Sequence, residues 1–251
     1  MNDIVKTHWR KIFISDIHLG SRLANAKALN EFLKRNTCDE IYLVGDIIDF
    51  WALRNKIYFP DDHLTVIRKI LKRASSGTKV FYVTGNHDEI LRGFSPATFG
   101  SISLVDEIVI TTAAGKTYLV IHGDIWDQCC THAKWLVYLG DFGYTSLIRL
   151  NGVVNFVRRK FGFGYWSLSA YAKAKVKQAV NFIGNYEEIV AKSAQERGVD
   201  GVICGHIHHA EMRYIDGVHY VNDGDFCESL SAVVEDDNGD LRLLRYEDWF
   251  K

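Results

Sequence analysis

Five apolar stretches of this chain each end in a short group of potential metal-binding side chains. They are KIFISDIH (residues 11–18), EIYLVGDIID (40–49), KVFYVTGNHD (79–88), TYLVIHGD (117–124) and GVICGHIHH (201–209). Each stretch has the β-branched and aromatic content of a buried strand, and its polar residues begin where the strand pattern stops. In open α/β sheets, ligands bind beyond the carboxyl ends of the strands. The repeated pattern therefore predicts an α/β fold with one binding site at a sheet edge.

The polar groups after these strands are imidazoles, carboxylates and one amide, all of which bind divalent metals. The predicted ligands are Asp16, His18, Asp46, Asn86, His122, His206 and His208. Asp16 and His18 are two residues apart, so their side chains leave an extended backbone on the same side. Gly45 allows a sharp turn that brings Asp46 close to the site. Because a carboxylate has two oxygens and can bridge two ions, the set predicts a dinuclear centre.

The predicted ligands supply nitrogen and oxygen donors and no thiolate, a combination that suits Mn²⁺, Fe or Zn²⁺. We expect two divalent ions, with Mn²⁺ as the first candidate and Fe or Zn²⁺ as the alternatives. Two such ions about 3.5–4 Å apart hold an activated hydroxide and clamp the oxygens of an in-line phosphoryl displacement. The predicted chemistry is therefore hydrolysis at phosphorus.

Each of these residues, taken alone, also has an ordinary structural interpretation. A histidine after a strand is commonly a hydrogen-bonded structural residue, and Asn86 after Gly85 fits a turn. We expect Asp49 to cap a helix or form an ion pair, and we leave it outside the ligand set. Asp124 and Asp127 are expected to contact the ligands or the substrate rather than the metals. The metal hypothesis is favoured because it explains all the strand ends together.

The segments between the motifs alternate helix and strand patterns. The predicted elements are helices at Asn25–Arg35 and Asp61–Ala74, strands at Ser101–Val109 and Lys116–Ile121, and further β structure over Val218–Leu244. No linker rich in Ser, Gly or Pro divides the chain, so we expect a single domain over residues 1–251. Residues 126–197 show helical patterns around glycine-rich turns and predict a helical insertion within that domain.

The predicted insertion is basic and rich in aromatic residues, although the whole chain has a net charge of -1. The segment from His132 to Lys177 contains eight Lys or Arg residues and a single acid, Asp141. One interpretation is an ordinary helical subdomain with solvated basic residues. The other is a cap for an amphiphilic phosphorylated substrate, because Lys and Arg pair with diphosphate oxygens and aromatic rings can line a groove for acyl chains.

Cysteine usage and hydropathy favour a cytoplasmic protein. The five cysteines form no CxxC pair, which disfavours a zinc knuckle or a disulfide framework. No apolar run reaches the roughly 18 residues of a membrane span. A lipid substrate would add peripheral contact between the basic insertion and anionic lipids of the inner membrane. The net charge of -1 disfavours a nucleic-acid partner.

The motifs DIH, GDIID, GNHD, HGD and GHIHH, in this order and spacing, resemble those of the calcineurin-like metallophosphoesterases. The resemblance extends from Lys11 to Phe226 and implies a two-sheet sandwich flanked by helices, with the metal site at one edge. It assigns one metal to Asp16, His18, Asp46 and His208. It assigns the other to Asp46, Asn86, His122 and His206. It also implies that His87 protonates the leaving group or stabilises charge on the phosphoryl oxygens, as an imidazole can near neutral pH.

Longer segments resemble the UDP-2,3-diacylglucosamine pyrophosphatase branch of that superfamily. They are GDIIDFW (45–51), GNHDEILRGF (85–94), HGDIWD (122–127) and the late helical insertion. The resemblance implies metal-hydroxide attack on the phosphorus next to uridine of a nucleotide-diphospho lipid. The products would be UMP and an acylated sugar 1-phosphate for lipid A biosynthesis, with the insertion as a cap over the acyl chains. The best-known members of the branch carry Arg at the position of His87, which here follows the general superfamily pattern.

Two other functions fit parts of the sequence. A phosphodiesterase or nuclease of the same superfamily, with a soluble substrate, would use the same ligands, and basic and aromatic residues also hold single-stranded nucleic acid. A non-catalytic lipid-binding or interaction module would keep the fold. Such a module is expected to lose ligands or the His87 position, and this chain has all of them.

Overall fold

The computed structural model describes residues 6–129, 160–161, 183 and 185–250. By its internal contacts the chain divides into two compact units, one of Met1–Asp124 with Val190–Lys251 and one of Ile125–Ile189. Every predicted ligand belongs to the first unit. The insertion predicted over 126–197, with its basic residues and their expected lipid contacts, lies largely outside the described residues, and its described end is a helix at residues 185–196. Its extent and a single domain over 1–251 stay predictions.

The strands in the described part of the chain form two sheets, one of seven strands and one of five. The first has the order β12–β11–β1–β2–β3–β5–β4, with strands at Leu241–Arg245, Ser231–Glu235, Thr7–Ile14, Asn36–Val44, Lys79–Val83, Ile102–Val105 and Ala97–Phe99. The second has the order β6–β7–β8–β10–β9, with strands at Glu107–Thr111, Thr117–Ile121, Gly201–Cys204, Val218–Asn222 and Glu211–Ile215.

The named helices of the described chain lie between strands, except for the last one, which follows β12. They are α1 (Ala26–Arg35), α2 (Phe50–Asn55), α3 (Asp61–Ser75) and the 3-10 helices η1 (Glu89–Phe94), η2 (Asp124–Cys129, which runs past the end of the unit) and η3 (Tyr246–Phe250). Asn25 caps α1, because its side chain accepts a hydrogen bond from the N–H of Ala28 at 3.1 Å. No helix among the described residues has the length and apolar character needed to cross a bilayer.

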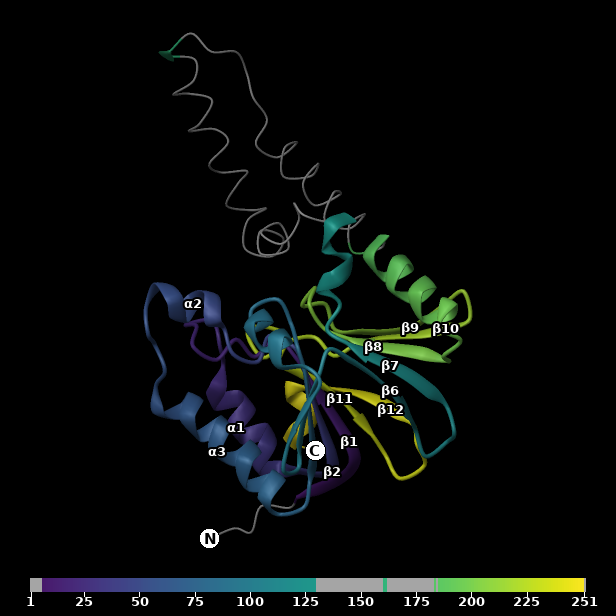
Figure 1. Cartoon of the computed structure of the whole chain (residues 1–251), viewed down its shortest axis with the longest axis horizontal. Helices are drawn as coiled ribbons and strands as arrows, with labels where there is room; N and C mark the ends of the chain where they lie inside the picture. Colours follow the sequence, from purple (N-terminus) through teal and green to yellow (C-terminus); the bar gives the residue numbers. More distant parts are fainter. Residues whose placement is uncertain (1–5, 130–159, 162–182, 184, 251) are drawn as a thin grey trace. The chain divides into compact units, whose positions relative to one another are not determined.

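Alternating side chains of the seven-stranded sheet supply two separate cores. In β1, Ile12 packs on one face of the sheet with Phe32 of α1 and Val66 of α3. The next residue, Phe13, packs on the other face with residues of the five-stranded sheet such as Val120. Helices α1 and α3 therefore cover the outer face of the first sheet, and the second sheet covers its inner face (Figure 1). This arrangement confirms the two-sheet α/β class predicted from the sequence.

The single strand predicted over Ser101–Val109 is wrong. The structure has two strands there, and they belong to different sheets: β5 pairs with β3 in the first and β6 with β7 in the second. The break falls at Asp106, whose carboxylate accepts a hydrogen bond from Thr84 Oγ1 at 2.7 Å. The apolar residues before Asp106 and after Glu107 gave one continuous strand pattern, which does not show that its two halves pair with different strands.

The carboxyl ends of five strands bring the sequence motifs together. Strands β1, β2 and β3 run parallel in the first sheet, and β7 and β8 run parallel in the second. His122 follows β7 and Asp46 follows β2, and His122 Nε2 lies 3.4 Å from Asp46 Oδ2. The edges of the two sheets therefore meet at the predicted ligands.

Candidate metal centre

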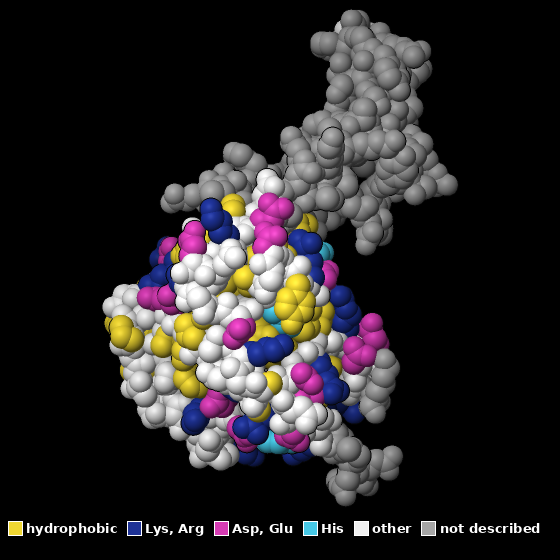
Figure 2. All heavy atoms as spheres, turned by 90° about the vertical axis from the view of Figure 1, so that its right-hand side faces the viewer, with side chains coloured by type: hydrophobic (Ala, Val, Ile, Leu, Met, Phe, Trp, Pro, Cys, Tyr) yellow, Lys and Arg dark blue, Asp and Glu magenta, His cyan; other side chains and the backbone are white. Residues whose placement is uncertain are grey.

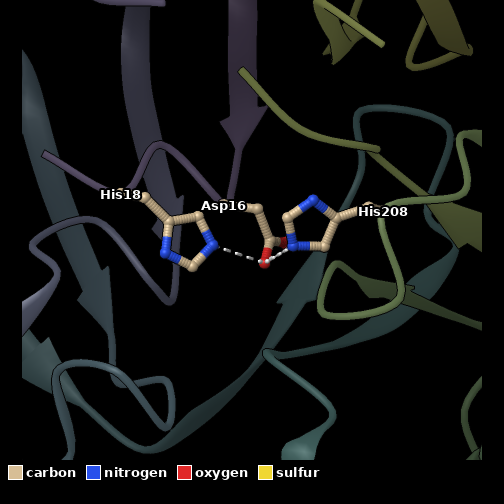
Figure 3. Close-up of side chains that lie close together, drawn as sticks. All are labelled: Asp16, His18 and His208. Carbon is tan, nitrogen blue, oxygen red and sulfur yellow. Dashed lines mark ion pairs between the residues drawn. The ribbon is translucent and has the colours of Figure 1, made fainter. Parts of the chain in front are cut away.

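Asp16 lies between two histidine rings just beyond the end of β1. Its Oδ1 atom is 3.7 Å from His18 Nε2 and 3.1 Å from His208 Nε2. Figure 3 shows both rings turned toward this carboxylate, and their centroids are 5.4 Å apart. Asp16 and His18 are buried, whereas the side chain of His208 is 25% exposed. Three donors thus converge on one point that solvent can reach.

Asp46 lies between this first group and a second pair of imidazoles. Its Oδ2 atom is 3.8 Å from His18 Nε2 and 3.4 Å from His122 Nε2. His206 Nδ1 lies 3.3 Å from His122 Nε2, so the second pair is in direct contact. One oxygen of Asp46 therefore has a histidine of each group beside it, which is the position of a carboxylate that bridges two cations.

The ring of His122 is oriented by the backbone. Its Nδ1 atom lies 2.9 Å from the carbonyl oxygen of Val44. A carbonyl can only accept, so Nδ1 carries the proton of this bond and Nε2 faces Asp46. Metal-binding imidazoles are commonly held by a backbone partner of this kind.

Two oxygen atoms of the predicted ligands are buried and have no hydrogen-bond partner among the described residues: Asp16 Oδ1 and Asn86 Oδ1. A buried acceptor without a partner costs about 1–3 kcal/mol. Asn86 belongs to this edge because the next residue, His87, donates its backbone N–H to Asp46 Oδ1 at 2.8 Å. Oxygen and imidazole donors left open in this way fit two divalent cations.

Backbone strain is concentrated at the predicted ligands. Positive φ angles occur at Asp16 (48°), His18 (52°), Asp46 (53°), His206 (72°) and His208 (55°). Among the other non-glycine residues that the structure describes, only Asp216 and Leu230 share this conformation. Left-handed backbone costs roughly 1–2 kcal/mol per residue and persists mainly where a site requires it. The turns that hold these side chains are thus built against local preference.

Two motif glycines are required by close approach. A Cβ atom at Gly45 would overlap the ring of His122, and one at Gly205 would overlap the carboxylate of Asp16. Gly45 also has a φ of +81°, which suits the sharp turn predicted before Asp46. The glycines that precede ligands therefore leave room for ligands from other strands.

The opposite charges of the centre shift each other's pKa. Burial alone would raise the pKa of Asp16, but His208 and His18 outweigh it and hold this pKa well below its usual range. Burial alone would lower the pKa of His18, but hydrogen bonding to Asp16 and Asp49 raises it to about 10. The pKa of His122 is likewise raised to about 10, mainly by Asp46 acting against burial. In the metal-free protein, the imidazoles of His18 and His122 therefore hold protons beside carboxylates that would otherwise face bound cations.

Metal affinity is expected to rise with pH. His18 and His122 have folded-state pKa values of about 10, so both are protonated in the metal-free protein at neutral pH and must lose protons to bind a cation. For each proton that must leave, the apparent metal-binding constant rises about tenfold per pH unit, as long as the pH stays below the pKa of that histidine. Calorimetric titration with Mn²⁺ at pH 6.5 and pH 8, in buffers of different ionisation enthalpy, measures affinity and released protons. Equal affinity at both pH values would contradict the expectation.

The same shifts predict how the metal-free protein responds to pH. A histidine whose pKa is raised on folding stabilises the protein fully below its unfolded pKa of about 6.5. For His18 and His122 this stabilisation is lost as the pH rises through about 10. Bound metal is therefore expected to stabilise the fold more at pH 8 than at pH 6.5.

His87 lies at the open side of the centre. Its side chain is 23% exposed, and its Nε2 atom is 3.9 Å from Asp46 Oδ2. The ring of Trp51 packs against it at a centroid distance of 4.2 Å. His87 Nδ1 lies 3.0 Å from Asp49 Oδ1, within ion-pairing distance although not aligned as a hydrogen bond. The Nε2 atom of His87 therefore lies on the side of the ring that faces the predicted ligand Asp46.

Asp49 has both of the roles expected from the sequence. Its Oδ1 atom accepts the N–H of Ala52 at 2.7 Å and caps α2, and its Oδ2 atom lies 3.5 Å from His18 Nδ1. Asp49, His18 and His87 are close enough to hold a cation themselves. However, Asp49 contacts the Nδ1 atoms of two rings whose Nε2 atoms lie near Asp46. We therefore interpret Asp49 as the group that orients both imidazoles.

Arg92 contacts Asp124, two residues after the predicted ligand His122, and the sequence did not reveal this contact. Its Nη2 atom donates to both carboxylate oxygens of Asp124 at 2.8 Å, and its Nε atom donates to Thr84 Oγ1 at 3.2 Å. Asp124 is thus paired with a cationic side chain, and its place outside the ligand set stays a prediction. The only sequence signal was the position of Arg92 within GNHDEILRGF. The side chain of Asp127 lies outside the described residues.

A two-sheet fold whose strand ends gather carboxylates, imidazoles and an amide defines the class of metal-dependent phosphoester hydrolases. The calcineurin-like phosphoesterase family matches residues 10–210, and the chain belongs to this family. The resemblance seen in the sequence, and the enzyme class that it implied, are confirmed.

Several proteins are similar to this chain over most of its length. The UDP-2,3-diacylglucosamine hydrolase of Neisseria meningitidis serogroup B is 24% identical over 242 residues, covering 90% of this chain and 93% of the relative. The protein of the same name from Psychromonas ingrahamii is 27% identical over 239 residues, covering 89% and 92%. Among solved structures, Vps29 of Chaetomium thermophilum superposes with a TM-score of 0.47 at 10% identity, covering 96% and 95%.

Proposed function

We propose that the protein is a diphosphatase that hydrolyses UDP-2,3-diacylglucosamine, or a closely similar nucleotide-diphospho lipid, to UMP and an acylated sugar 1-phosphate. The reaction type is supported above all by Asp46, whose Oδ2 atom lies between His18 and His122. The substrate is supported by similarity to UDP-2,3-diacylglucosamine hydrolases over about nine tenths of both chains.

The seven predicted ligands would hold two divalent ions. Asp16, His18 and His208 would surround one ion, Asn86, His122 and His206 the other, and Asp46 would contact both. When bound, the ions supply Lewis acidity that activates water and neutralises phosphoryl oxygens. We propose Mn²⁺ for both positions, with Fe or Zn²⁺ as alternatives, because the donors are nitrogen and oxygen only.

His87 is proposed as the group that acts on the leaving oxygen. Water loses a proton to solvent as its oxygen forms a bond to the phosphorus next to uridine, and the bond from that phosphorus to the bridging oxygen breaks. The electron pair goes to the acylated sugar phosphate. His87 Nε2 donates a proton or a hydrogen bond to this oxygen, and Asp49 Oδ1 lies 3.0 Å from Nδ1 on the other side of the ring. Trp51 packs on the ring and limits its movement.

The surface charge supports a small phosphorylated substrate more than a nucleic acid. Figure 2 shows one face on which Lys and Arg side chains are interspersed with Asp and Glu, and neither sign forms a large patch there. Nucleic-acid affinity depends on many cationic contacts with the phosphate backbone. A soluble phosphodiester stays the alternative substrate class.

Acyl-chain dependence is the sharpest test of the substrate. We expect Mn²⁺-loaded protein to release UMP from UDP-2,3-diacylglucosamine, and to lose this activity with a chelator until Mn²⁺ is restored. Burial of only about four methylene groups at ~0.8 kcal/mol each would make kcat/KM more than about 100-fold higher than for the unacylated UDP-sugar. Chromatography of UMP measures both rates. Faster cleavage of a soluble phosphodiester than of the lipid would contradict the assignment.

A further inference from the structure

We propose that Asp223 is a hydrogen-bond donor that positions Asp16 through the hydroxyl group of Ser15. Ser15 Oγ lies 2.6 Å from Asp223 Oδ1 and 2.7 Å from Asp16 Oδ2. All three residues are buried. The role of Asp16 as a metal ligand rests on the proposed function, whereas the hydrogen-bond arrangement does not.

The number of hydrogens between these groups requires a protonated carboxyl. A serine hydroxyl carries one hydrogen, so Ser15 can donate to only one of the two carboxyl oxygens beside it. If both acids were ionised, one of the two short contacts would join lone pairs with no hydrogen between them. Either Asp16 or Asp223 must therefore hold a proton.

Asp16 has the surroundings of the ionised partner. Its Oδ2 atom accepts the backbone N–H of His206 at 2.8 Å in addition to the contact with Ser15. Its Oδ1 atom faces the imidazoles of His18 and His208. These groups stabilise an ionised carboxylate at Asp16.

Asp223 has the surroundings of a neutral acid. Within the described chain no Lys, Arg or His side chain forms an ion pair with it, and its Oδ2 atom is buried without a hydrogen-bond partner. Burying an ionised carboxylate in this way costs far more than burying the neutral acid. Burial also raises the pKa of Asp223 well above its usual value. Asp223 therefore donates to Ser15, and Ser15 donates to Asp16 Oδ2, which at 2.7 Å is closer to the hydroxyl than the backbone oxygen of Gly224 at 3.1 Å.

This chain of donors decides which oxygen of Asp16 is available. Oδ2 is held by Ser15 and by the N–H of His206, which leaves Oδ1 as the open oxygen toward His18 and His208. A neutral Asp223 orients the carboxylate without placing a second negative charge behind it. Outer partners of this kind typically change metal affinity 10–100-fold. Asp223 is thus a positioning residue.

Three variants separate hydrogen-bond donation from charge. Asp223→Asn carries an uncharged amide that can still donate to Ser15, so we expect Mn²⁺ affinity within about threefold of the unmodified protein. Asp223→Ala and Ser15→Ala interrupt the chain of donors, and we expect binding about 10–100-fold weaker. Ser231→Ala is the matched control, because this buried serine donates only to the backbone oxygen of Asp223 at 2.8 Å and contacts Ser229. Calorimetric titration with Mn²⁺ measures all four.

Infrared difference spectroscopy tests the proton directly, without metal or substrate. We expect a carboxylic-acid carbonyl band at neutral pH in the unmodified protein that disappears in Asp223→Asn. Loss of an ionised carboxylate band instead would overturn the proposal, and so would an Asp223→Asn variant that binds Mn²⁺ as weakly as Asp223→Ala. If the acid band is present but the protein hydrolyses no phosphoester, the proposed function fails and the assignment of Asp223 stands.

Discussion

Replacing Asp46 by alanine is expected to remove both metal ions, whereas replacing a ligand of one ion is expected to weaken that ion alone. Asp46 Oδ2 has His18 Nε2 at 3.8 Å and His122 Nε2 at 3.4 Å. Losing a partner outside the ligand set costs 10–100-fold in metal affinity, so losing a shared ligand should cost more than about 100-fold at both positions. Metal supplies several kcal/mol to phosphoryl transfer, so activity should fall about 1000-fold or more.

Metal analysis after gel filtration, combined with hydrolysis rates, measures this effect. Asp39→Ala is the matched control, because it removes an exposed carboxylate from the same strand, β2, where Asp39 Oδ1 lies 3.3 Å from His8 Nε2 and away from the predicted ligands. His208→Ala provides the second comparison and should lose affinity at one position. An Asp46→Ala protein that still holds two ions per chain would show that the carboxylate is not shared.

Most of the fold could be predicted because its signals are local. The helices predicted over Asn25–Arg35 and Asp61–Ala74 agree with α1 and α3 to within a residue or so at each end, since their apolar residues follow the helical period. The strand predicted over Ser101–Val109 was wrong because the apolar pattern continues through Asp106. Its two halves pair with β3 and β7, and a strand pattern contains no information about which sheet it joins.

In the candidate site, too, residues with a local sequence signal were predicted, and residues that matter only through tertiary contacts were not. Asp46 and His122 were found because each belongs to a short motif at a strand end. The contact between Ser15 and Asp223 joins residues 208 positions apart, and neither residue type indicates a metal site by itself. Arg92 gains its role only from contact with Asp124. Side chains that contact the predicted ligands or their neighbours from elsewhere in the sequence could therefore be identified only in the folded structure.

Replacing His87 by alanine is expected to lower kcat about 100- to 10,000-fold while both metal ions are retained. The ring lies at the rim, with 23% of its side chain exposed and Nε2 3.9 Å from Asp46 Oδ2. Its removal leaves every predicted ligand in place, so metal analysis should find the same content as in the unmodified protein. His8→Ala, which removes a half-exposed histidine from β1, is the control. An unchanged rate would exclude His87 from the reaction.

His87→Arg separates the two roles proposed for this residue. Arginine keeps a positive charge and hydrogen-bond donors, but it does not release a proton near neutral pH. If His87 stabilises charge, the variant should keep most of its activity on a diphosphate, whose leaving group is a phosphate that departs without protonation. If His87 transfers a proton, the variant should be as slow as His87→Ala, most of all on phosphodiesters with alkoxide leaving groups. Rates on both substrates distinguish these outcomes.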